Sequence, residues 1–422
     1  MDKFVVNGGK KLQGEVILKA AKNSVLPMIA CSILTKEDVI LKNIPSLSDI
    51  TNMLKIIKNL GGTAEEKENS VYINNKNAAP SLITGDLTNA IRSSIFMLGP
   101  ILSRFKYARL GMPGGCDIGA RPIDIHIDGL TRLNAKIKCV GGFIECDGSD
   151  MRGGAVNLKF PSVGATENIM MAAVLTKGTT VINNAALEPE IIDLANFINT
   201  LGGCISGAGT GKITVEGVKE LNGGNYYPLG DRIAAPTYLT AACITKGNIT
   251  VRGVSGGLFS SVLDVFYNMG CKVKTGNDFV TVSCSKRLNA CGDIFAAPYP
   301  SFPTDMQPQI VSALAAADGI SQIKETVFEK RFNYTNQLNK LGAKIEVNDN
   351  IAVITGVKKL LAAEVTVQDL RGGAALTLAS LGIDGATVIN DICHIDRGYD
   401  KMEDVLLGLG ADIRRETINK KH

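Results

Sequence analysis

Charged and polar side chains recur at matching points of this 422-residue sequence, each just before an apolar stretch of helical character. The points are 69, 72, 68, 73 and 66 residues apart and are marked by Asn23, Arg92, Gly164, Arg232, Asp305 and Arg371. A helix N-terminus presents unpaired N–H groups and the positive end of the helix dipole, so several of them beside cations can bind a multiply charged anion. Ordinary helix caps explain Ser162 and Thr304 equally well. They do not explain Lys22, Arg92 and Arg371, because a cation at a helix N-terminus opposes the dipole unless an anion lies between them.

A glycine-rich loop over residues 111–122 carries a cysteine near its middle and ends on Arg121 and Pro122. Four glycines and two prolines in twelve residues predict a surface loop, and an apolar core has no use for so much glycine. Neighbouring cations favour the thiolate of a cysteine. Cys116 is therefore a candidate proton donor or nucleophile, whereas the other nine cysteines are predicted to be structural.

Two further motifs concern anion binding. Arg397, followed by Gly398, lies between a predicted short strand and the last helix and is a candidate for contacting an anion, while His394 is predicted to be structural. Residues 206–213 resemble a nucleotide phosphate loop, but Ser206 replaces its first glycine and Ile213 its metal-binding hydroxyl residue. This segment is predicted to be a hairpin turn.

The elements that carry these residues form an internal repeat. A helix followed by Leu-Gly-Gly or a close variant, and then by a strand, recurs at intervals of 73, 68, 68, 72 and 68 residues, beginning at Leu60, Leu133, Leu201, Met269, Leu341 and Leu409. Each copy is predicted to be a β-α-β-α-β-β unit. Six units exceed one hydrophobic core, which stops growing near roughly 250–300 residues. We predict an α/β protein of two domains with three units each: 22–229, which carries the Cys116 loop, and 1–21 with 230–422, where the strand Phe4–Val6 completes the C-terminal half.

Composition excludes several classes of function. The net charge is only +4 and no long basic block occurs, which argues against nucleic-acid binding. No leader-like N-terminus and no apolar run long enough for a membrane span is present, and the ten cysteines contain no CxxC pair. We expect a cytoplasmic protein with reduced thiols, no metal and no membrane partner. The sequence sets no oligomeric state, and a monomer is compatible with it.

With these residues in view, the whole chain resembles the enolpyruvyl transferases that act on UDP-N-acetylglucosamine. The motifs that carry this resemblance are Lys22-Asn23, Gly114-Gly115-Cys116, Gly119-Ala120-Arg121-Pro122, 162–166, Glu188-Pro189-Glu190, 302–307, 325–328 and 394–399. The resemblance implies two inside-out α/β domains with pseudo-threefold symmetry and a substrate cleft between them. It implies transfer of the enolpyruvyl group of phosphoenolpyruvate to the sugar 3-hydroxyl, with release of phosphate, as the first committed step of peptidoglycan synthesis.

The resemblance also implies roles for individual residues. Lys22, Arg121 and Arg397 would hold the phosphate of phosphoenolpyruvate, and Arg371 with Arg331 would face its carboxylate. The sugar nucleotide would contact Asn23, Arg92, Arg121, Pro122, Ile123, Asp124, Ile125, Ser162, Val163, Gly164, Asp305 and Val327. Cys116 would donate the proton to the methylene carbon and react with fosfomycin, and Asp305 would accept or position the proton of the sugar hydroxyl. Glu188, Asp231 and Asp369 would support these residues, and no cofactor is implied.

Two departures from the resemblance and two alternatives remain. Phe160 stands where some relatives have a lysine, and Ala234-Ala235-Pro236 replaces a string that often contains an acidic residue and glycine. The first alternative is the related enzyme that acts on shikimate 3-phosphate, which Cys116 and Lys22-Asn23 argue against. The second is a non-catalytic protein that binds UDP-N-acetylglucosamine.

Overall fold

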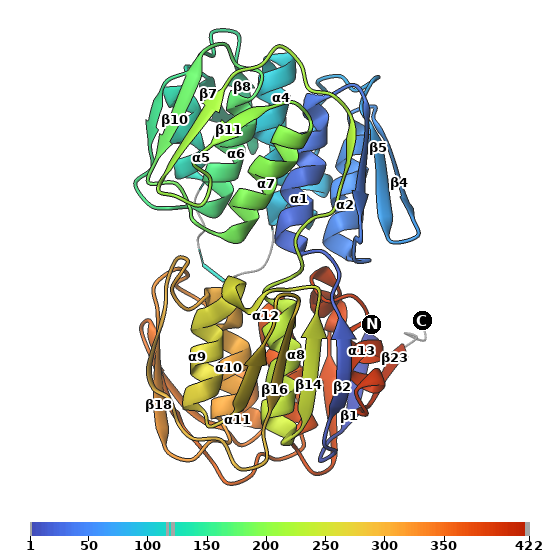
Figure 1. Cartoon of the computed structure of the whole chain (residues 1–422), viewed down its shortest axis with the longest axis vertical. Helices are drawn as coiled ribbons and strands as arrows, with labels where there is room; N and C mark the ends of the chain where they lie inside the picture. Colours follow the sequence, from blue (N-terminus) through green and yellow to red (C-terminus); the bar gives the residue numbers. More distant parts are fainter. Residues whose placement is uncertain (1, 115–117, 120–122, 418–422) are drawn as a thin grey trace. The chain divides into compact units, whose positions relative to one another are not determined.

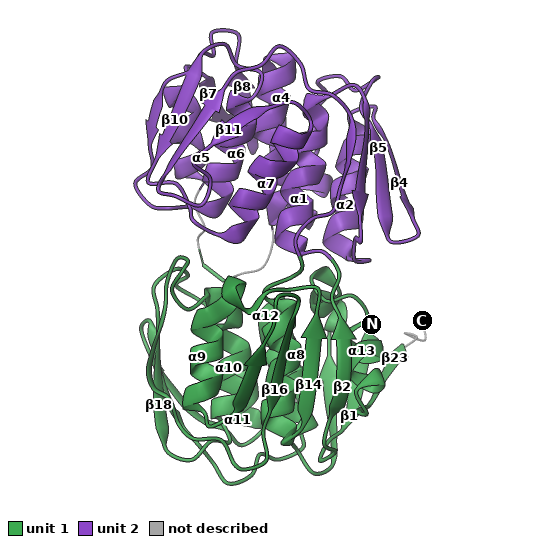
Figure 2. Ribbon diagram, in the orientation of Figure 1, with its two compact units in different colours: residues 1–19, 116–121, 230–422 green, residues 20–115, 122–229 purple. Residues whose placement is uncertain are grey.

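The computed structural model describes residues 2–114, 118–119 and 123–417, and the chain folds into two compact units (Figures 1 and 2). Unit 1 contains residues 1–19, 116–121 and 230–422, and unit 2 contains residues 20–115 and 122–229. Each unit has its own hydrophobic core, and the two cores share no residue.

The strands of unit 2 alternate with its helices along the chain (Figure 1). In order, the elements of unit 2 are α1 (Lys22–Cys31), η1 (Ser32–Leu34), β3 (Asp38–Lys42), α2 (Ser48–Asn59), β4 (Thr63–Lys67), β5 (Ser70–Asn74), α3 (Gly85–Ala90), η2 (Arg92–Met97), α4 (Leu98–Phe105), β6 (Tyr107–Gly111), α5 (Asp124–Arg132), β7 (Lys136–Val140), β8 (Phe143–Asp147), β9 (Ala155–Asn157), α6 (Val163–Ala173), β10 (Thr179–Asn183), α7 (Pro189–Thr200), β11 (Cys204–Ser206), β12 (Lys212–Glu216) and β13 (Gly224–Tyr226).

Unit 1 repeats this alternation, except that its first two strands come from the start of the chain. Its elements are β1 (Asp2–Asn7), β2 (Gln13–Ile17), α8 (Ala234–Thr245), β14 (Asn248–Arg252), η3 (Gly256–Phe259), α9 (Ser260–Asn268), β15 (Lys272–Thr275), β16 (Phe279–Ser283), β17 (Gly292–Ala296), η4 (Thr304–Met306), α10 (Gln307–Leu314), β18 (Ile320–Glu325), α11 (Thr335–Lys340), β19 (Lys344–Asn348), β20 (Ile351–Thr355), β21 (Glu364–Thr366), α12 (Leu370–Leu381), β22 (Ala386–Asn390), η5 (Ile392–Arg397), α13 (Met402–Gly408) and β23 (Asp412–Thr417).

The predicted β-α-β-α-β-β unit is confirmed. In the unit β9-α6-β10-α7-β11-β12, β9 pairs in parallel with β10, and β10 and β11 flank β12 in antiparallel pairs. The sheet β17-β18-β20-β19 has the same order and directions. In the sheet β6-β8-β7 the position of the first strand is taken by a single parallel bridge from Ile83 to Leu110. The six sheets of the described residues therefore follow one plan.

Three sheets are completed by strands from distant parts of the sequence. β13 pairs in parallel with β3, β2 pairs in parallel with β14, and β1 lies between β22 and β23 in antiparallel pairing. The predicted strand Phe4–Val6 lies within β1, whose partners both come from the C-terminal part of the chain. Each unit is consequently closed by a strand that is remote in sequence from the strand it pairs with.

The first helix of each repeat lies inside its unit. In unit 1, α8, α10 and α12 pack against one another, and all twelve residues of α12 are buried. Gly373 lets α12 lie close to η5 and to the segment after β21, since a Cβ on Gly373 would lie 2.7 Å from side-chain carbons of both Ile395 and Val367. The second helices are instead amphipathic: in α2 the buried residues Ile50, Met53, Leu54 and Ile57 follow helical spacing. Because a buried helix has no polar face, the residues of this helix that a ligand can reach lie near its ends.

The predicted starts of these buried helices are confirmed. Lys22 begins α1, Arg92 begins η2, and Asp305 lies in η4, directly before α10. At the second and fifth repeats the α-helix is thus preceded by a 3-10 turn, which the sequence pattern does not distinguish from helix. The predicted hairpin at 206–213 is also confirmed, because β11 and β12 pair in antiparallel fashion on either side of it.

The division into units differs from the predicted boundaries at two places. Residues 20 and 21 belong to unit 2, where Ala20 N–H donates to the carbonyl of Asn43 and Ala21 N–H to that of Leu229. Ile118 and Gly119 belong to unit 1, because the Lys330 N–H donates to the Ile118 carbonyl at 3.1 Å. No helix in the described part of the chain is both long and apolar enough to cross a membrane.

Candidate active site

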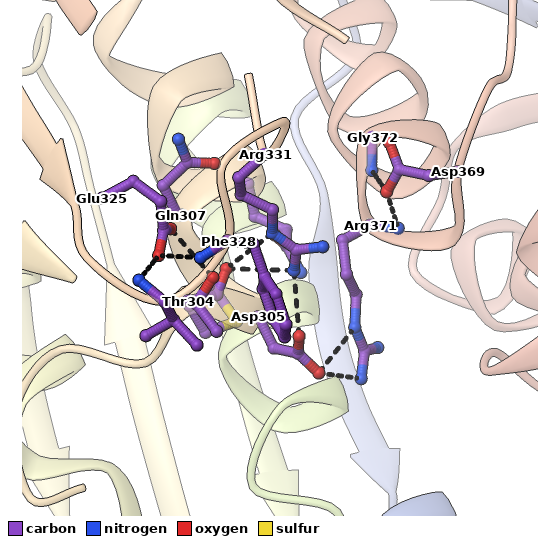
Figure 3. A network of polar contacts seen from close by, with 12 residues as sticks. Thr304, Asp305, Gln307, Glu325, Phe328, Arg331, Asp369, Arg371 and Gly372 are labelled. Atoms are coloured by element: carbon purple, nitrogen blue, oxygen red, sulfur yellow. Dashed lines mark hydrogen bonds and ion pairs between the residues drawn. The ribbon is translucent and has the colours of Figure 1, made fainter. Parts of the chain in front are cut away.

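Two buried arginines of unit 1 converge on one carboxylate (Figure 3). Nη2 of Arg331 donates to Oδ1 of Asp305 at 2.9 Å, and Nη2 and Nε of Arg371 donate to Oδ2 at 3.0 and 3.3 Å. Both guanidinium groups are almost fully buried, whereas the Asp305 side chain is 29% exposed. The carboxylate is therefore held by the two arginines and still open to an approaching group.

This cluster retains unused capacity to bind an anion. The two guanidinium groups share one carboxylate as their hydrogen-bonded acidic partner. Within the described residues, Nη1 of Arg371 is buried without a hydrogen-bond partner at ordinary geometry, and Tyr399 is the neighbouring side chain that interacts with this guanidinium. A buried donor left unpaired costs about 1–3 kcal/mol, so such donors are rare unless a ligand or water satisfies them. The arrangement favours a negatively charged ligand beside Arg371.

The segment around Val327 is tied to the same cluster. Nη2 and Nε of Arg331 donate to the Thr304 carbonyl at 3.0 and 3.2 Å, and the Thr304 hydroxyl donates to Glu325 at 2.8 Å. Glu325 accepts the N–H groups of Val327 and Phe328 through its other oxygen (Figure 3). Burial raises the pKa of Glu325, although these hydrogen bonds oppose the rise. Glu325 thus fixes the backbone at Val327, a predicted substrate residue, relative to Asp305.

Arg371 is positioned by the start of α12. Asp369 caps this helix, since its carboxylate accepts the N–H groups of Arg371 and Gly372 at 3.0 Å (Figure 3). The Arg371 guanidinium also lies 5.3 Å from the centre of the Tyr399 ring.

The turn that carries Arg397 packs beside α12. A Cβ on Gly398 would lie 2.6 Å from a side-chain carbon of Leu370, the residue before Arg371. The segment of the predicted phosphate-binding Arg397, itself half-buried, therefore lies against the start of the helix that bears Arg371.

The glycine-rich loop reaches the same region of unit 1. Ile118 accepts from the N–H of Lys330, and Gly119, with a φ of +141°, lies so near Glu329 that a Cβ there would meet its carboxylate oxygen. Both contacts are next to Arg331 in sequence. The predicted residues Cys116, Arg121 and Pro122 lie outside the described residues.

In unit 2, Lys22 is buried at the first position of α1 and forms an ion pair with Asp49. The Nζ–Oδ2 distance is 2.8 Å, and both side chains are nearly inaccessible. Asn23 follows Lys22 in the same turn and is half-buried. Sequence reasoning missed Asp49, because a partner 27 residues away on the next helix has no local signature. Asp49 therefore supplies the negative charge that stabilises Lys22 at the N-terminus of α1.

Asn168 of α6 and His126 of α5 form a second polar cluster of unit 2, close to the start of α4. Asn168 accepts the Gly99 N–H at 2.6 Å, so its NH₂ group faces the Ile95 carbonyl at 3.0 Å and Nδ1 of His126 at 3.1 Å. Nδ1 of His126 is then an acceptor, which leaves the ring proton on Nε2. Burial, followed by the charge of Arg92, lowers the pKa of His126 to about 3, so the imidazole is neutral near pH 7.

His126 lies beside the start of α6, whose residues Ser162, Val163 and Gly164 are predicted to contact the sugar nucleotide. A Cβ on Gly164 would lie 3.3 Å from Cε1 of His126, and Ser162 caps α6 by accepting the Ala165 N–H. The sequence does not single out His126 or Asn168, although His126 directly follows residues 121–125, which are predicted to contact the sugar nucleotide. Arg92 is half-buried, donates to the Pro113 carbonyl at 3.4 Å, and has a pKa lowered by burial.

The remaining predicted residues have diverse surroundings. Asp124 is exposed in the first turn of α5, between a buried Ile123 and a half-buried Ile125, and Val163 begins α6. Glu188 is buried at the N-cap position of α7, and Asp231 accepts the N–H groups of Ile233 and Ala234 at 2.8 Å.

Neither departure from the family pattern disturbs the fold around it. Phe160 is exposed. Pro236 lies in the first turn of α8, where its missing N–H has no intrahelical partner to lose.

Taken by itself, unit 1 offers an anion site with an accessible carboxylate, a combination suited to removing a proton from a hydroxyl group next to a bound anion. Among the residues that the structure describes, no group of three or more His, Cys, Asp or Glu side chains is placed to hold a metal ion. The nine described cysteines are all free thiols.

Comparison with known proteins defines the class. Residues 6–406 match the family described as EPSP synthase (3-phosphoshikimate 1-carboxyvinyltransferase), and the chain belongs to this family of enolpyruvyl transferases. It is similar in fold to the enolpyruvyl transferase NikO from Streptomyces tendae, with a TM-score of 0.89 at 23% identity over 99% of both chains. It is also similar to an EPSP synthase from Acinetobacter baumannii, with a TM-score of 0.77 at 17% identity over 99% of this chain and 100% of the other. At these identities the structural likeness concerns the fold alone.

Sequence relatives are more specific. The chain is 46% identical to UDP-N-acetylglucosamine 1-carboxyvinyltransferase 2 of Caldanaerobacter subterraneus subsp. tengcongensis, over 98% of this chain and 100% of the relative. It is 44% identical to UDP-N-acetylglucosamine 1-carboxyvinyltransferase of Coxiella burnetii (strain RSA 493 / Nine Mile phase I), over 98% of this chain and 96% of the relative. The predicted resemblance to enolpyruvyl transferases is confirmed.

Proposed function

We propose that this protein transfers the enolpyruvyl group of phosphoenolpyruvate to the 3-hydroxyl of UDP-N-acetylglucosamine, releasing phosphate, in the cytoplasm. The observation that carries the proposal is the convergence of Arg331 and Arg371 on an accessible Asp305, with a buried Arg371 donor left unpaired. The names of the full-length relatives supply the acceptor. The reaction would commit the sugar nucleotide to peptidoglycan synthesis.

Phosphoenolpyruvate carries two kinds of anionic group, and the proposal assigns cations to each. Arg371 and Arg331 would face the carboxylate, for which the free Nη1 of Arg371 is a suitable donor. Lys22, Arg121 and Arg397 would hold the phosphate and stabilise the charge that develops as it leaves. Binding of phosphate would then compete with Asp49 for Lys22, since the pair is 2.8 Å apart in the structure.

The sugar nucleotide would be bound mainly by residues at the starts of buried helices. The diphosphate would lie against the first turn of α6 at Ser162, Val163 and Gly164, where N–H groups are available. The uridine and sugar would contact Asn23, Arg92, the stretch Arg121 to Ile125, Asp305 and Val327. Glu188, Asp231 and Asp369 would hold these helix starts in place.

The chemistry is an addition followed by an elimination. Cys116 would give a proton to the methylene carbon of phosphoenolpyruvate while the sugar oxygen bonds to the adjacent carbon and Asp305 accepts the hydroxyl proton. The resulting tetrahedral ketal then loses phosphate and returns one proton of its new methyl group to the Cys116 thiolate, which restores the double bond and the thiol. No oxidation takes place, and no cofactor enters the balance.

The description of the matching family raises shikimate 3-phosphate as a second acceptor. Phosphate release from phosphoenolpyruvate should be measured with each acceptor in turn, with omission of acceptor as the blank. We expect release with UDP-N-acetylglucosamine only. Release with shikimate 3-phosphate alone would overturn the proposal.

The role of Cys116 can be tested by labelling. Fosfomycin should add one equivalent to the wild-type protein in intact-mass spectra, and Cys116→Ser should abolish the adduct and lower turnover. Cys139→Ser is the matched control, because Cys139 is an exposed thiol outside the proposed site. Full labelling of the Cys116 variant would show that another thiol reacts.

A further inference from the structure

One arginine of the last strand anchors the turn that carries Arg397. Nη2 and Nη1 of Arg415 donate to the two carboxylate oxygens of Asp396 at 2.6 and 3.0 Å, a two-pronged ion pair. Asp396 directly precedes Arg397 at the end of η5. We propose that Arg415 is a positioning residue for phosphoenolpyruvate binding, because it fixes the Asp396–Arg397 turn; this inference rests on the proposed function.

The Arg415 guanidinium contacts residues of several elements besides η5. Arg415 lies in β23 directly opposite Phe4 of β1, and its guanidinium is 5.3 Å from the centre of that fully buried ring. Its Nε donates to Glu403 of α13, and Nη1 also donates to Asp2 of β1 at 3.2 Å. One guanidinium thus joins two strands, a helix and the η5 turn.

Geometry and burial separate this pair from an ordinary surface salt bridge. Exposed single pairs contribute about 0–1 kcal/mol, whereas two-pronged pairs within a network contribute more. The Arg415 side chain is 26% exposed, Asp396 is 33% exposed, and Glu403, the other partner in the network, is 11% exposed. Within the described residues the second oxygen of Glu403 is buried without a partner, so Glu403 depends on Arg415.

The neighbours of Arg397 are immobilised on both sides. Ile395 is part of the hydrophobic core and Gly398 packs on Leu370. The Tyr399 hydroxyl hydrogen-bonds Thr237 and Gln309. Between these points, the Asp396 carboxylate is held by two hydrogen bonds from Arg415. Loss of these bonds should allow Arg397 to move, while Ile395 and Tyr399 keep their packing.

The test uses Asp396→Asn, which keeps the shape of the side chain and removes its charge. We expect the KM for phosphoenolpyruvate to rise about tenfold, a change of about 1.4 kcal/mol, because Arg397 is proposed to hold its phosphate. The KM for UDP-N-acetylglucosamine should stay unchanged, and kcat should change far less than the KM for phosphoenolpyruvate. Arg415→Met should produce the same split, Arg415→Lys should restore part of the affinity, and the double variant with Asp396→Asn should be no worse than Arg415→Met alone.

Two controls separate positioning from stability. Glu403→Gln breaks another arm of the same network, away from the turn, and should lower the melting temperature without moving the KM for phosphoenolpyruvate. Arg414→Ala removes an exposed arginine of the same strand and should alter neither.

An unchanged KM for phosphoenolpyruvate in Asp396→Asn, or an equal rise for both substrates, would overturn the inference. Should Arg415→Met fail to fold, Asp396→Asn decides alone. A wild-type protein without activity would instead contradict the proposed function.

Discussion

Asp305 is proposed to serve both as the counter-ion of two binding arginines and as the base that accepts a proton. Its carboxylate compensates two buried guanidinium groups and is also the accessible acceptor nearest to them. The side chain that we propose as the base is therefore also the counter-ion of the site. Removal of its charge should affect turnover and binding in opposite directions.

Asp305→Asn should lower kcat on the order of 100-fold or more, the usual contribution of a positioned base. Affinity for phosphoenolpyruvate, measured by calorimetry, should be retained or increased, because Arg331 and Arg371 lose their counter-ion. Asp318→Asn is the control, since Asp318 is the exposed partner of Arg287. Retained turnover in Asp305→Asn would remove this carboxylate from the chemistry.

The buried Glu167 of α6 makes the stability of the protein depend on pH. Burial, followed by the charges of Glu190 and Glu188, raises the pKa of Glu167 well above its usual range, and one of its oxygens has no partner among the described residues. The folded protein therefore binds the proton more tightly than the unfolded chain, and stability falls as the pH rises from 4.5 through the raised pKa.

Glu167→Gln should remove this loss. Its melting temperature should exceed that of the wild type at pH 8, and the difference should vanish near pH 4.5. Scanning calorimetry at several pH values measures both, with Glu220→Gln as an exposed control. A difference independent of pH would mean that Glu167 does not titrate as inferred.

The first turn of a buried helix contributes both to the stability of that helix and to the binding of substrate. α12 is buried along its whole length, so its polar connections are concentrated at its ends. Asp369 provides two of them at the N-terminus, where it holds the backbone of Arg371. The same carboxylate therefore stabilises the helix and orients an arginine of the site.

Asp369→Ala should lower the free energy of unfolding by about 1 kcal/mol, the usual contribution of an N-cap, as measured by urea denaturation. It should also raise the KM for phosphoenolpyruvate, because Arg371 follows the cap. Asp369→Asn keeps an acceptor oxygen and should be milder in both respects. A loss of stability with wild-type kinetics would show that the cap does not orient Arg371.

For the whole molecule, the exchange of strands decides which parts can fold alone. Unit 2 contains every strand of its own sheets, including β13 at the end of its sequence. Residues 230–422 lack both β1, which is central to one sheet, and β2, which forms the edge of another. Residues 20–229 therefore contain all the strands that their sheets need, whereas residues 230–422 do not.

A fragment of residues 20–229 should fold cooperatively by itself, whereas 230–422 should not. Joining residues 2–19 behind residue 422 by a short Gly/Ser linker should restore folding of the second fragment, because Asp2 and Thr417 are paired neighbours. Circular dichroism and amide NMR spectra would report both outcomes. Folding of 230–422 alone would contradict the required role of β1.

The amino-acid sequence predicts the six-fold repeat, its strand and helix order, and the register of polar residues at the helix starts, because these features depend on local spacing and on helix and turn chemistry. It also indicates the family through motifs that remain contiguous in the chain. The contacts of Asp305 with Arg331 and Arg371, of Lys22 with Asp49, and of Arg415 with Asp396 are visible only in the folded protein. These partners are 19 to 66 residues apart, and their contact follows from how helices and strands pack, for which the sequence carries no local signal.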